Sequence, residues 1–266
     1  MERACMSNVE EFKTNKMNIG IGVTTYKRPK HLKLWEEQVA MFMPEGAELF
    51  IAHDNTKRLG IAARKNQLLR AFDFKKCDYI FLFDDDCFPI KEGWADLFIN
   101  ASKLSTHQHM MYLKETGTIK KIGSVDVTPT YDEFGVKVDG NIRIVIDSFN
   151  NCAGCMMFLT RDVLLKVGGY GKYLNYGFEH AGYSDRIHQA GLTPLGRYSC
   201  PAGVEEYIYS MDYDYSKREL YQRKVDHKPS MGALEMKTQI AMNKENYERD
   251  IEQVYQTVET FFDDDE

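Results

Sequence analysis

The stretch Asp78–Asp86, with the sequence DYIFLFDDD, decides the fold of this chain. A short apolar and aromatic run, Asp78–Phe83, leads directly into three consecutive aspartates. Such a run, bounded by polar residues, is typical of a strand that is buried on both faces of a parallel sheet. The aspartates follow at the carboxyl end of this strand, which is where open α/β sheets bind their ligands.

Two further segments before this stretch have the same design. The predicted strands are Asn18–Thr25 and Glu48–His53, and the second is followed by Asp54-Asn55. Helical patterns follow the three predicted strands, at His31–Met43, Gly60–Phe74 and Gly93–Leu104. This alternation predicts an α/β fold with a mixed, mainly parallel sheet flanked by helices, and it brings three polar strand ends to one edge.

The chain changes character after residue 104, where short β-prone runs are separated by turn signals. We expect these runs to be antiparallel strands added to the same sheet, with a hairpin turn at Asp139-Gly140. The predicted strands are Met110–Leu113, Ile119–Val127, Val136–Val138, Asn141–Ile146 and Cys152–Leu159. Two helices are predicted in this half, at Arg161–Val167 and Tyr183–Ala190.

These patterns predict one catalytic domain with additions at both ends. Residues 1–17 form a polar lead-in without the apolar core of a signal peptide. Residues 18–104 form the first half of this domain, and residues 105–215 form its second half. Residues 216–266 form a charged, helical C-terminal extension with an acidic tail.

Composition limits the possible classes of protein. The 266 residues carry a net charge of −6, with 43% hydrophobic and 28% charged residues, as in an ordinary globular enzyme. This charge does not indicate a nucleic-acid or anionic membrane surface. No apolar run is long enough to span a membrane. Six scattered cysteines are typical of a reduced, cytoplasmic chain, and the pair Cys152–Cys155 lacks the second ligand pair of a zinc site.

The aspartate run has the chemistry of a cation site. Mg²⁺ and Mn²⁺ prefer oxygen ligands and commonly take one or two carboxylates together with phosphate oxygens. Strand alternation would place the side chains of Asp84 and Asp86 on one side of the strand. The side chain of Asp85 would point to the other side, where it would have a structural role. The alternative is a strand-ending turn with solvated acids, but three adjacent acids repel each other without a counter-ion.

Several motifs in order resemble those of the family 2 glycosyltransferases, which have the GT-A fold. In that family, a first strand runs into Thr-x-Tyr/Phe-x-Arg-Pro, a second strand ends in aspartate, and a helix with Arg and Asn precedes a DxD motif. A Gly-Gly turn, a Glu-Asp motif and an arginine follow. The matching residues here are Thr24-Thr25-Tyr26-Lys27-Arg28-Pro29, Asp54, Arg64, Asn66, Asp84-Asp85-Asp86, Gly168-Gly169, Glu179-His180 and Asp185-Arg186.

The resemblance implies a role for each group of residues. Thr25 and Asp54 would contact the nucleobase, and Arg64 and Asn66 would help to place the ribose and diphosphate. Asp84 would reach the ribose and share the metal, which is Mn²⁺ or Mg²⁺, with its principal ligand, Asp86. The predicted donor-binding set is completed by Thr24, Tyr26, Arg28 and Asp85. The implied reaction is hexosyl or pentosyl transfer from a nucleotide sugar, with a UDP-sugar and inversion favoured.

The sequence departs from the family pattern at the catalytic base. The family places an aspartate where this chain has His180, and the preceding residue is Glu179. A carboxylate or an imidazole can accept a proton near neutral pH, and we favour Glu179. His180 is either a base, an acceptor contact or a core histidine. His227 is the candidate for a third metal ligand from the C-terminal region, with a structural histidine as the alternative.

Two other classes of function remain open at this point. A nucleotidyltransferase also uses aspartates and a metal, but it would normally show a glycine-rich loop after the first strand, which the segment Thr24–Lys30 lacks. A non-catalytic sugar-binding protein would keep the fold without turnover. The acceptor and the oligomeric state are not determined by the sequence, and a modified nucleic-acid base is not excluded as the acceptor.

Overall fold

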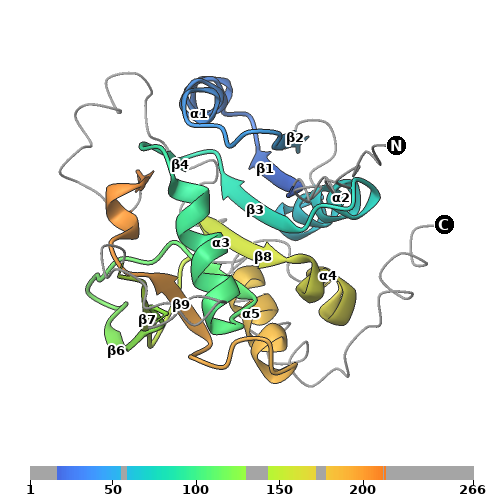
Figure 1. The fold of residues 1–266 in the computed structure, drawn as a ribbon. Coiled ribbons are helices and arrows are strands. Elements are labelled where there is room, and N and C mark those ends of the chain that lie inside the picture. The colour runs from blue at the N-terminus through green and yellow to red at the C-terminus, as the bar shows by residue number, and fades with distance from the viewer. Residues whose placement is uncertain (1–16, 55–58, 130–142, 172–177, 212, 214–266) are drawn as a thin grey trace, which may run out of the picture.

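The computed structural model describes residues 17–54, 59–129, 143–171, 178–211 and 213. Its main sheet has five strands in the order β2-β1-β3-β8-β5 (Figure 1). These strands are β1 Ile19–Thr25, β2 Glu48–His53, β3 Tyr79–Asp84, β5 His109–Met111 and β8 Met156–Thr160. β1 runs parallel to β2 and β3, whereas β8 is antiparallel to both β3 and β5. The expected mixed, mainly parallel sheet is therefore confirmed.

Helices flank this sheet, as the alternating pattern predicted. They are α1 Pro29–Met41, α2 Ile61–Phe74, α3 Trp94–Ser105, α4 Arg161–Val167, α5 Glu179–Gln189 and the 3₁₀ turn η1 Val204–Glu206. α1 starts at a proline, whose fixed φ suits the first helical position. α5 begins four residues earlier than predicted, because Phe178 turns the chain in the left-handed region, at φ 63°, directly before Glu179.

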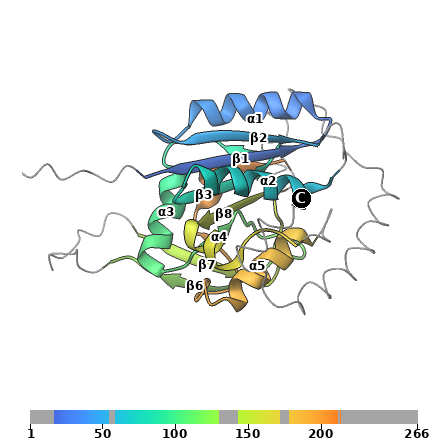
Figure 2. The same ribbon diagram turned by 90° about the vertical axis from the view of Figure 1, so that its right-hand side faces the viewer.

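The expectation that all later strands join the main sheet is wrong. Among the described residues only β5 and β8 do so, and β6 Lys121–Asp126, β7 Val145–Phe149 and β9 Tyr198–Pro201 form a separate antiparallel sheet. A further pair, β4 Cys87–Pro89 and β10 Ile208–Ser210, was not predicted. β7 is bordered by β6 and β9 on its two edges, so neither edge is left for β5. Figure 2 shows α1 beside the β2–β1 edge and the β6–β7 pair at the opposite end of the molecule.

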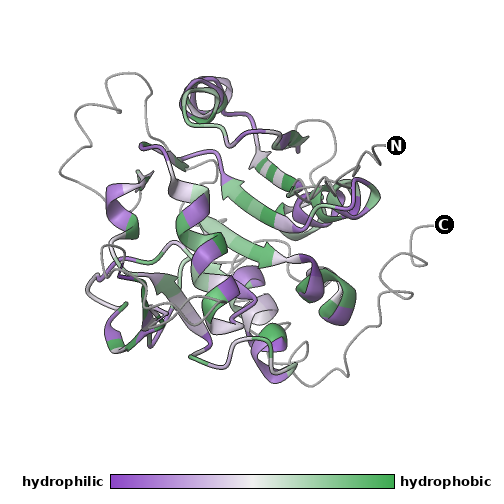
Figure 3. Cartoon of the chain, viewed as in Figure 1, coloured by the Kyte–Doolittle hydropathy of each residue, from purple (hydrophilic) through white to green (hydrophobic). Residues whose placement is uncertain are grey.

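The core forms where α2 and α3 press on the central strands. Gly20 and Gly22 of β1 have no side chain because an added Cβ would lie 2.4 Å and 2.9 Å from the ring of Phe72 in α2. On β3, the Phe81 ring packs against Trp94 of α3 with ring centroids 4.7 Å apart. Figure 3 shows that β3 and β8 are largely hydrophobic. These apolar strands give the polar residues at their ends a rigid base.

Some predictions lie outside the described residues. They are the strand Val136–Val138, the turn Asp139-Gly140, the C-terminal extension 216–266 and His227. No helix in the described ranges is long and apolar enough to cross a membrane. All five cysteines in the described ranges, which include Cys152 and Cys155, are free thiols.

Candidate active site

The polar ends of the three parallel strands meet at one edge of the sheet. Thr24 on β1 is in register with Asp84 on β3, and its hydroxyl donates to Asp84 Oδ1 at 3.3 Å. The backbone N–H of Asp54, which follows β2, donates to the carbonyl of Thr25 at 2.9 Å. Parallel pairing therefore brings together residues that are 60 positions apart in the chain, as the sequence predicted.

The aspartate run is held by the threonine–arginine motif that follows β1. Thr25 Oγ1 donates to Asp85 Oδ2 at 2.6 Å, and Arg28 Nη1 lies 2.7 Å from Asp85 Oδ1. Both terminal nitrogens of Arg28 also donate to Asp86 Oδ2, at 3.1 Å and 3.0 Å. Asp85 is thus held in place by Thr25 and Arg28, and both its expected structural role and its expected place in the donor site stay predictions.

One part of the sequence argument for this run needs correction. Strand alternation does not place Asp86, because β3 ends at Asp84 and a turn carries Asp85 and Asp86 into β4. The turn gives each acid different partners instead. Asp84 is paired with Lys65, whereas Asp85 and Asp86 are paired with Arg28.

The three carboxylates carry more negative charge than their neighbours offset. Burial raises the pKa of Asp84 to about 6, against the opposing charge of Lys65 and with the support of Asp86 and Glu179. Burial likewise raises the pKa of Asp85 to about 7, although Arg28 and the Thr25 hydroxyl act in the other direction. Such raised values indicate a site that favours additional positive charge.

The donor atoms fit a hard divalent cation that is also bound by phosphate. Among the described residues, no group of three or more histidine, cysteine, aspartate or glutamate side chains is arranged to hold a metal by itself. Thr24 and Lys65 contact Asp84 through Oδ1, and Arg28 donates to Asp86 Oδ2. The other carboxylate oxygens, Asp84 Oδ2 and Asp86 Oδ1, accept no hydrogen bond from the described part of the chain. Two such oxygens match a cation that takes one or two carboxylates and completes its shell with phosphate and water.

The predicted nucleoside contacts have partners within the protein. Asp54 accepts hydrogen bonds from the backbone N–H groups of Leu59 and Gly60 and from Arg64 Nε, at 2.9, 3.1 and 3.0 Å. Asn66 makes two hydrogen bonds with the backbone of Tyr170, at 2.8 and 3.1 Å. Asp54 therefore shapes the start of α2, and Asn66 anchors a distant segment. The roles expected for Asp54, Arg64 and Asn66 at the ribose, base and diphosphate stay predictions.

Lys65 is a site residue that the sequence reasoning missed. Its side chain is completely buried, its Nζ lies 3.3 Å from Asp84 Oδ1, and it lies 4.0 Å from Glu179 Oε1. Burial acts to lower the pKa of Lys65, but the charges of Asp84 and Glu179 outweigh burial and raise it. A signal was present in the sequence, because Lys65 interrupts the apolar face that Ala62, Leu68 and Leu69 form on the same helix.

Glu179, which is buried, and His180, which is partly buried, form an ion pair at the start of α5. Glu179 Oε1 lies 3.2 Å from His180 Nδ1, and Glu179 is only 4% exposed. Although burial opposes both charges, His180 and Lys65 lower the pKa of Glu179 to about 2, and Glu179 with Cys152 raises the pKa of His180 to about 10. Glu179 Oε2 has no hydrogen-bond partner among the described residues. At neutral pH this is a carboxylate with one uncommitted oxygen beside an imidazolium.

Three glycines, Gly154, Gly168 and Gly169, shape this second half of the site. An added Cβ on Gly154 would lie 2.5 Å from the His180 ring, so the turn before β8 leaves room for that ring only because residue 154 is glycine. The Tyr183 hydroxyl donates to the Gly168 carbonyl at 2.6 Å, and Arg186 donates to the carbonyls of Val167 and Gly169. The Gly-Gly turn and the arginine of the motif therefore fix α5 against α4.

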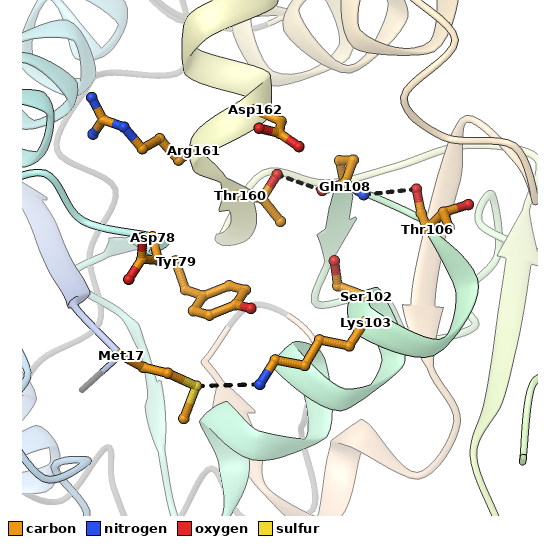
Figure 4. A pocket seen from close by; sticks show the side chains of 10 residues that line it. All are labelled: Met17, Asp78, Tyr79, Ser102, Lys103, Thr106, Gln108, Thr160, Arg161 and Asp162. Carbon is orange, nitrogen blue, oxygen red and sulfur yellow. Dashed lines mark hydrogen bonds between the residues drawn. The ribbon is translucent and has the colours of Figure 1, made fainter. Parts of the chain in front are cut away.

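A separate cavity of about 520 Å³ lies at the other end of β3. Figure 4 shows Lys103 reaching towards Met17, near the ring of Tyr79, and Gln108 joined to Thr160 by a hydrogen bond. None of the predicted site residues lines this cavity. It is therefore distinct from the strand ends where the acids gather.

The chain is similar in structure to several solved glycosyltransferases, although not in sequence. No family model matches the chain, and no curated protein matches its sequence. Among solved structures, the chain is similar to Drosophila β-1,4-galactosyltransferase 7, a mutant of which is in complex with manganese, UDP-Gal and xylobiose. The identity is 16%, the match covers 83% of this chain and 79% of that one, and the TM-score is 0.45.

Two other structures show a similar degree of likeness. The mannosyltransferase PcManGT from Pyrobaculum calidifontis, in complex with GDP-Man and Mn²⁺, is 15% identical over 65% of this chain and 52% of that one, with a TM-score of 0.43. S. aureus TarS 1-349 is 10% identical over 85% of this chain and 70% of that one, with a TM-score of 0.48.

Proposed function

We propose that the chain is a metal-dependent glycosyltransferase that moves a sugar from a nucleotide-sugar donor to an acceptor hydroxyl. The observation that carries the proposal is one connected cluster at the sheet edge. Asp84–Asp86 lie at the end of β3 with a surplus of negative charge, and Lys65 links Asp84 to the buried carboxylate of Glu179. In this proposal residues 18–104 bind the donor, and residues 105–215 bind the acceptor and supply the catalytic base.

The donor side needs to stabilise a leaving nucleoside diphosphate. Breaking the glycosidic bond leaves negative charge on the diphosphate, which a bound Mn²⁺ or Mg²⁺ would offset. Asp86 and Asp84 are the residues that would hold this cation, each through the oxygen that the described protein groups leave unbonded. Arg28 keeps Asp86 in position and Thr25 keeps Asp85 in position.

The nucleotide would lie across the ends of β1 and β2. The proposed donor contacts are Thr24, Thr25, Tyr26, Arg28, Asp54, Arg64, Asn66, Asp84 and Asp85, by resemblance to the family motifs. Asp54 and Arg64 already form an ion pair at 3.0 Å, so the surface offered to the base and ribose is preorganised. A UDP-sugar is the proposed donor, and the transferred group is a hexosyl or pentosyl unit.

The acceptor side needs a group that takes a proton from the attacking hydroxyl. A candidate base must hold a free lone pair and lie within hydrogen-bond reach of its substrate. His180 has a pKa raised to about 10 and is therefore protonated at neutral pH, whereas Glu179 is ionised and has an uncommitted oxygen. We assign Glu179 as the base of an inverting displacement and His180 as the cation that keeps it ionised. Because a carboxylate of low pKa is a weak base, the proton would move as the new bond forms.

Turnover of nucleotide sugars tests this function most directly. Purified protein would be incubated with a panel of UDP-, GDP- and other nucleotide sugars, with Mn²⁺, with Mg²⁺ or with a chelator. We expect release of nucleoside diphosphate that requires the cation and that Asp86→Ala abolishes. Asp96→Ala, which changes an exposed aspartate of α3, is the matched control and should behave as the parent protein.

The same assay separates the competing functions. Release of pyrophosphate from a nucleoside triphosphate would identify a nucleotidyltransferase. Binding of a nucleotide sugar in a calorimeter without any turnover would identify a non-catalytic sugar-binding protein. If no nucleotide sugar is bound or turned over with either cation, the proposal is wrong.

A further inference from the structure

Lys65 lies in α2 and touches segments from both halves of the chain. Its Nζ lies 3.3 Å from Asp84 Oδ1 and 4.0 Å from Glu179 Oε1, and it donates to the Gly154 carbonyl at 3.4 Å. We propose that Lys65 is a positioning residue that fixes the donor-side carboxylate, Asp84, relative to the acceptor-side carboxylate, Glu179. The inference deepens the proposed function and rests on it.

The complete burial of Lys65 means that its charged amine must be stabilised by protein groups. The side chain is 0% exposed, and an ammonium group taken out of water is costly unless charged and hydrogen-bonding partners replace the water. Its partners come from β3, from the start of α5 and from the turn before β8, and the ring of Tyr170 lies 5.7 Å from its Nζ. A lysine needed only to fill space in α2 would not require charged partners from separate segments.

The contacts also explain the orientation of the proposed base. Glu179 Oε1 faces both Lys65 and His180 Nδ1, while Glu179 Oε2 has no hydrogen-bond partner in the described part of the chain. His180 follows Glu179 in the same helix and can keep it ionised, but it gives no link to β3. Among the ion pairs that Glu179 makes with described residues, only the one with Lys65 continues to Asp84. Lys65 therefore sets how far the free oxygen of the base lies from the donor side.

The residue next to Lys65 supports the same interpretation. Asn66 binds the backbone of Tyr170 through both its carbonyl oxygen and its amide nitrogen, at 2.8 and 3.1 Å. Consecutive residues of α2 thus hold two points of the second half of the chain. Because α2 also packs directly on β1 through Phe72, it provides a rigid support between the two halves of the site.

A double-mutant cycle in the transfer reaction tests the positioning role. We expect Lys65→Met to lower kcat by about 100-fold in the parent protein and by about twofold at most in a Glu179→Gln background. Lys65→Arg should restore part of the lost rate, because it returns the charge. Equal losses in both backgrounds would show that Lys65 only supports the fold, and the inference would be overturned.

A second cycle does not depend on activity. The free energy of unfolding would be measured by chemical denaturation in metal-free buffer for Lys65→Met, for Asp84→Asn with Glu179→Gln, and for all three changes together. Coupling between Lys65 and the two acids supports the inference, and additive effects contradict it. The pair Lys75 and Glu48, 3.0 Å apart with both side chains 42% exposed, is the control and should show almost no coupling.

The two cycles also separate this inference from the proposed function. If the parent protein turns over no nucleotide sugar, the proposed function fails, but coupling in the unfolding cycle still decides whether Lys65 joins the two acids. If Lys65→Met does not fold, Asp84→Asn and Glu179→Gln are made singly and together with Lys65 in place. The same pair is then measured with Lys65→Arg in place of Lys65. A changed coupling between the acids supports a shared lysine, and an unchanged coupling, which their direct repulsion alone would give, overturns it.

Discussion

The two sides of the candidate site bury carboxylates to a similar degree, yet treat their charge in opposite ways. Asp85, on the donor side, is 2% exposed and has a pKa raised to about 7, whereas Glu179, on the acceptor side, is 4% exposed and has a pKa lowered to about 2. The difference lies in the partners. Three acids share Arg28 and Lys65 on the donor side, while Glu179 has His180 beside it and Lys65 within 4.0 Å.

In the proposed function, the two sides of the site serve two chemical tasks. The donor side retains a surplus of negative charge, which suits a group that arrives with a cation. On the acceptor side, the negative charge of Glu179 is already balanced by His180 and Lys65. These cations keep the carboxylate ionised and available as a base. Local charge balance, and not burial alone, sets the pKa of each acid.

The largest expected effect comes from removing the proposed cation ligand. Asp86→Ala should lower kcat/KM by about 1,000-fold or more, because the charge on the leaving diphosphate would no longer be offset. Steady-state kinetics across a Mn²⁺ titration would measure it, with circular dichroism to show that the fold is intact. Activity within tenfold of the parent protein would remove Asp86 from the site.

The next effect distinguishes the two candidates for the base. Glu179→Gln should lower kcat by about 100-fold or more, whereas His180→Asn should cost about tenfold, because it removes a partner of the base and not the base itself. Both variants would be compared side by side at saturating donor. A larger loss for His180→Asn would reverse the assignment.

A pH experiment tests the contrast between the two sides directly. The pKa of Asp85 is raised in the folded state, from a reference value of 3.8 to about 7. Its contribution to stability is therefore fully present below pH 3.8 and is lost as the pH rises through 7. Metal-free protein should lose about 2 kcal/mol between pH 5 and pH 7 through this group, and Asp85→Asn should remove that part of the pH-dependent loss.

The acceptor side should behave differently in the same denaturation experiment. Glu179 has a lowered pKa, so its contribution is present above its reference value of 4.5 and is lost as the pH falls through 2. His180 has a raised pKa, so its contribution is present below 6.5 and is lost as the pH rises through 10. Between pH 5 and 6.5 the pair should add almost no slope. A slope in that window that Glu179→Gln removes would contradict the assigned ion pair.

The smallest effect concerns the space that holds His180. Gly154→Ala places a Cβ 2.5 Å from the His180 ring and should destabilise the fold by about 1–2 kcal/mol, while weakening the ion pair with Glu179. Chemical denaturation would measure the change. Gly123→Ala, at a position where an added Cβ meets nothing within 4 Å, is the matched control. Equal effects of the two changes would show that the glycine is not required by His180.

The donor side could be predicted largely from the sequence, for a physical reason. Three short apolar runs alternate with amphipathic helices, and parallel pairing of such strands sends all their carboxyl ends to one edge. Thr24, Thr25, Asp54 and Asp84 therefore converge by topology alone. The expected order of elements and the placement of these residues required no knowledge of side-chain contacts.

The acceptor side could be predicted only in part. The motif residues Glu179 and His180 were found, but α5 begins earlier than its periodicity indicates, and β6, β7 and β9 form a sheet of their own. Strand pairing between residues about 50 positions apart, as between β7 and β9, leaves no local signal in the sequence. The hydrophobic pattern identifies strands, but the choice of partner depends on which edges remain open.

The sequence by itself determined the class of fold, the position of the aspartate run at a strand end and the identity of most polar groups around it. Those properties follow from local periodicity and from the fixed geometry of parallel strands. Only the tertiary structure decided that Lys65 is buried between Asp84 and Glu179 and that Asn66 anchors Tyr170. Charges on residues 114 positions apart determine one another's ionisation only after folding places them a few ångströms apart, in surroundings with little water to screen them.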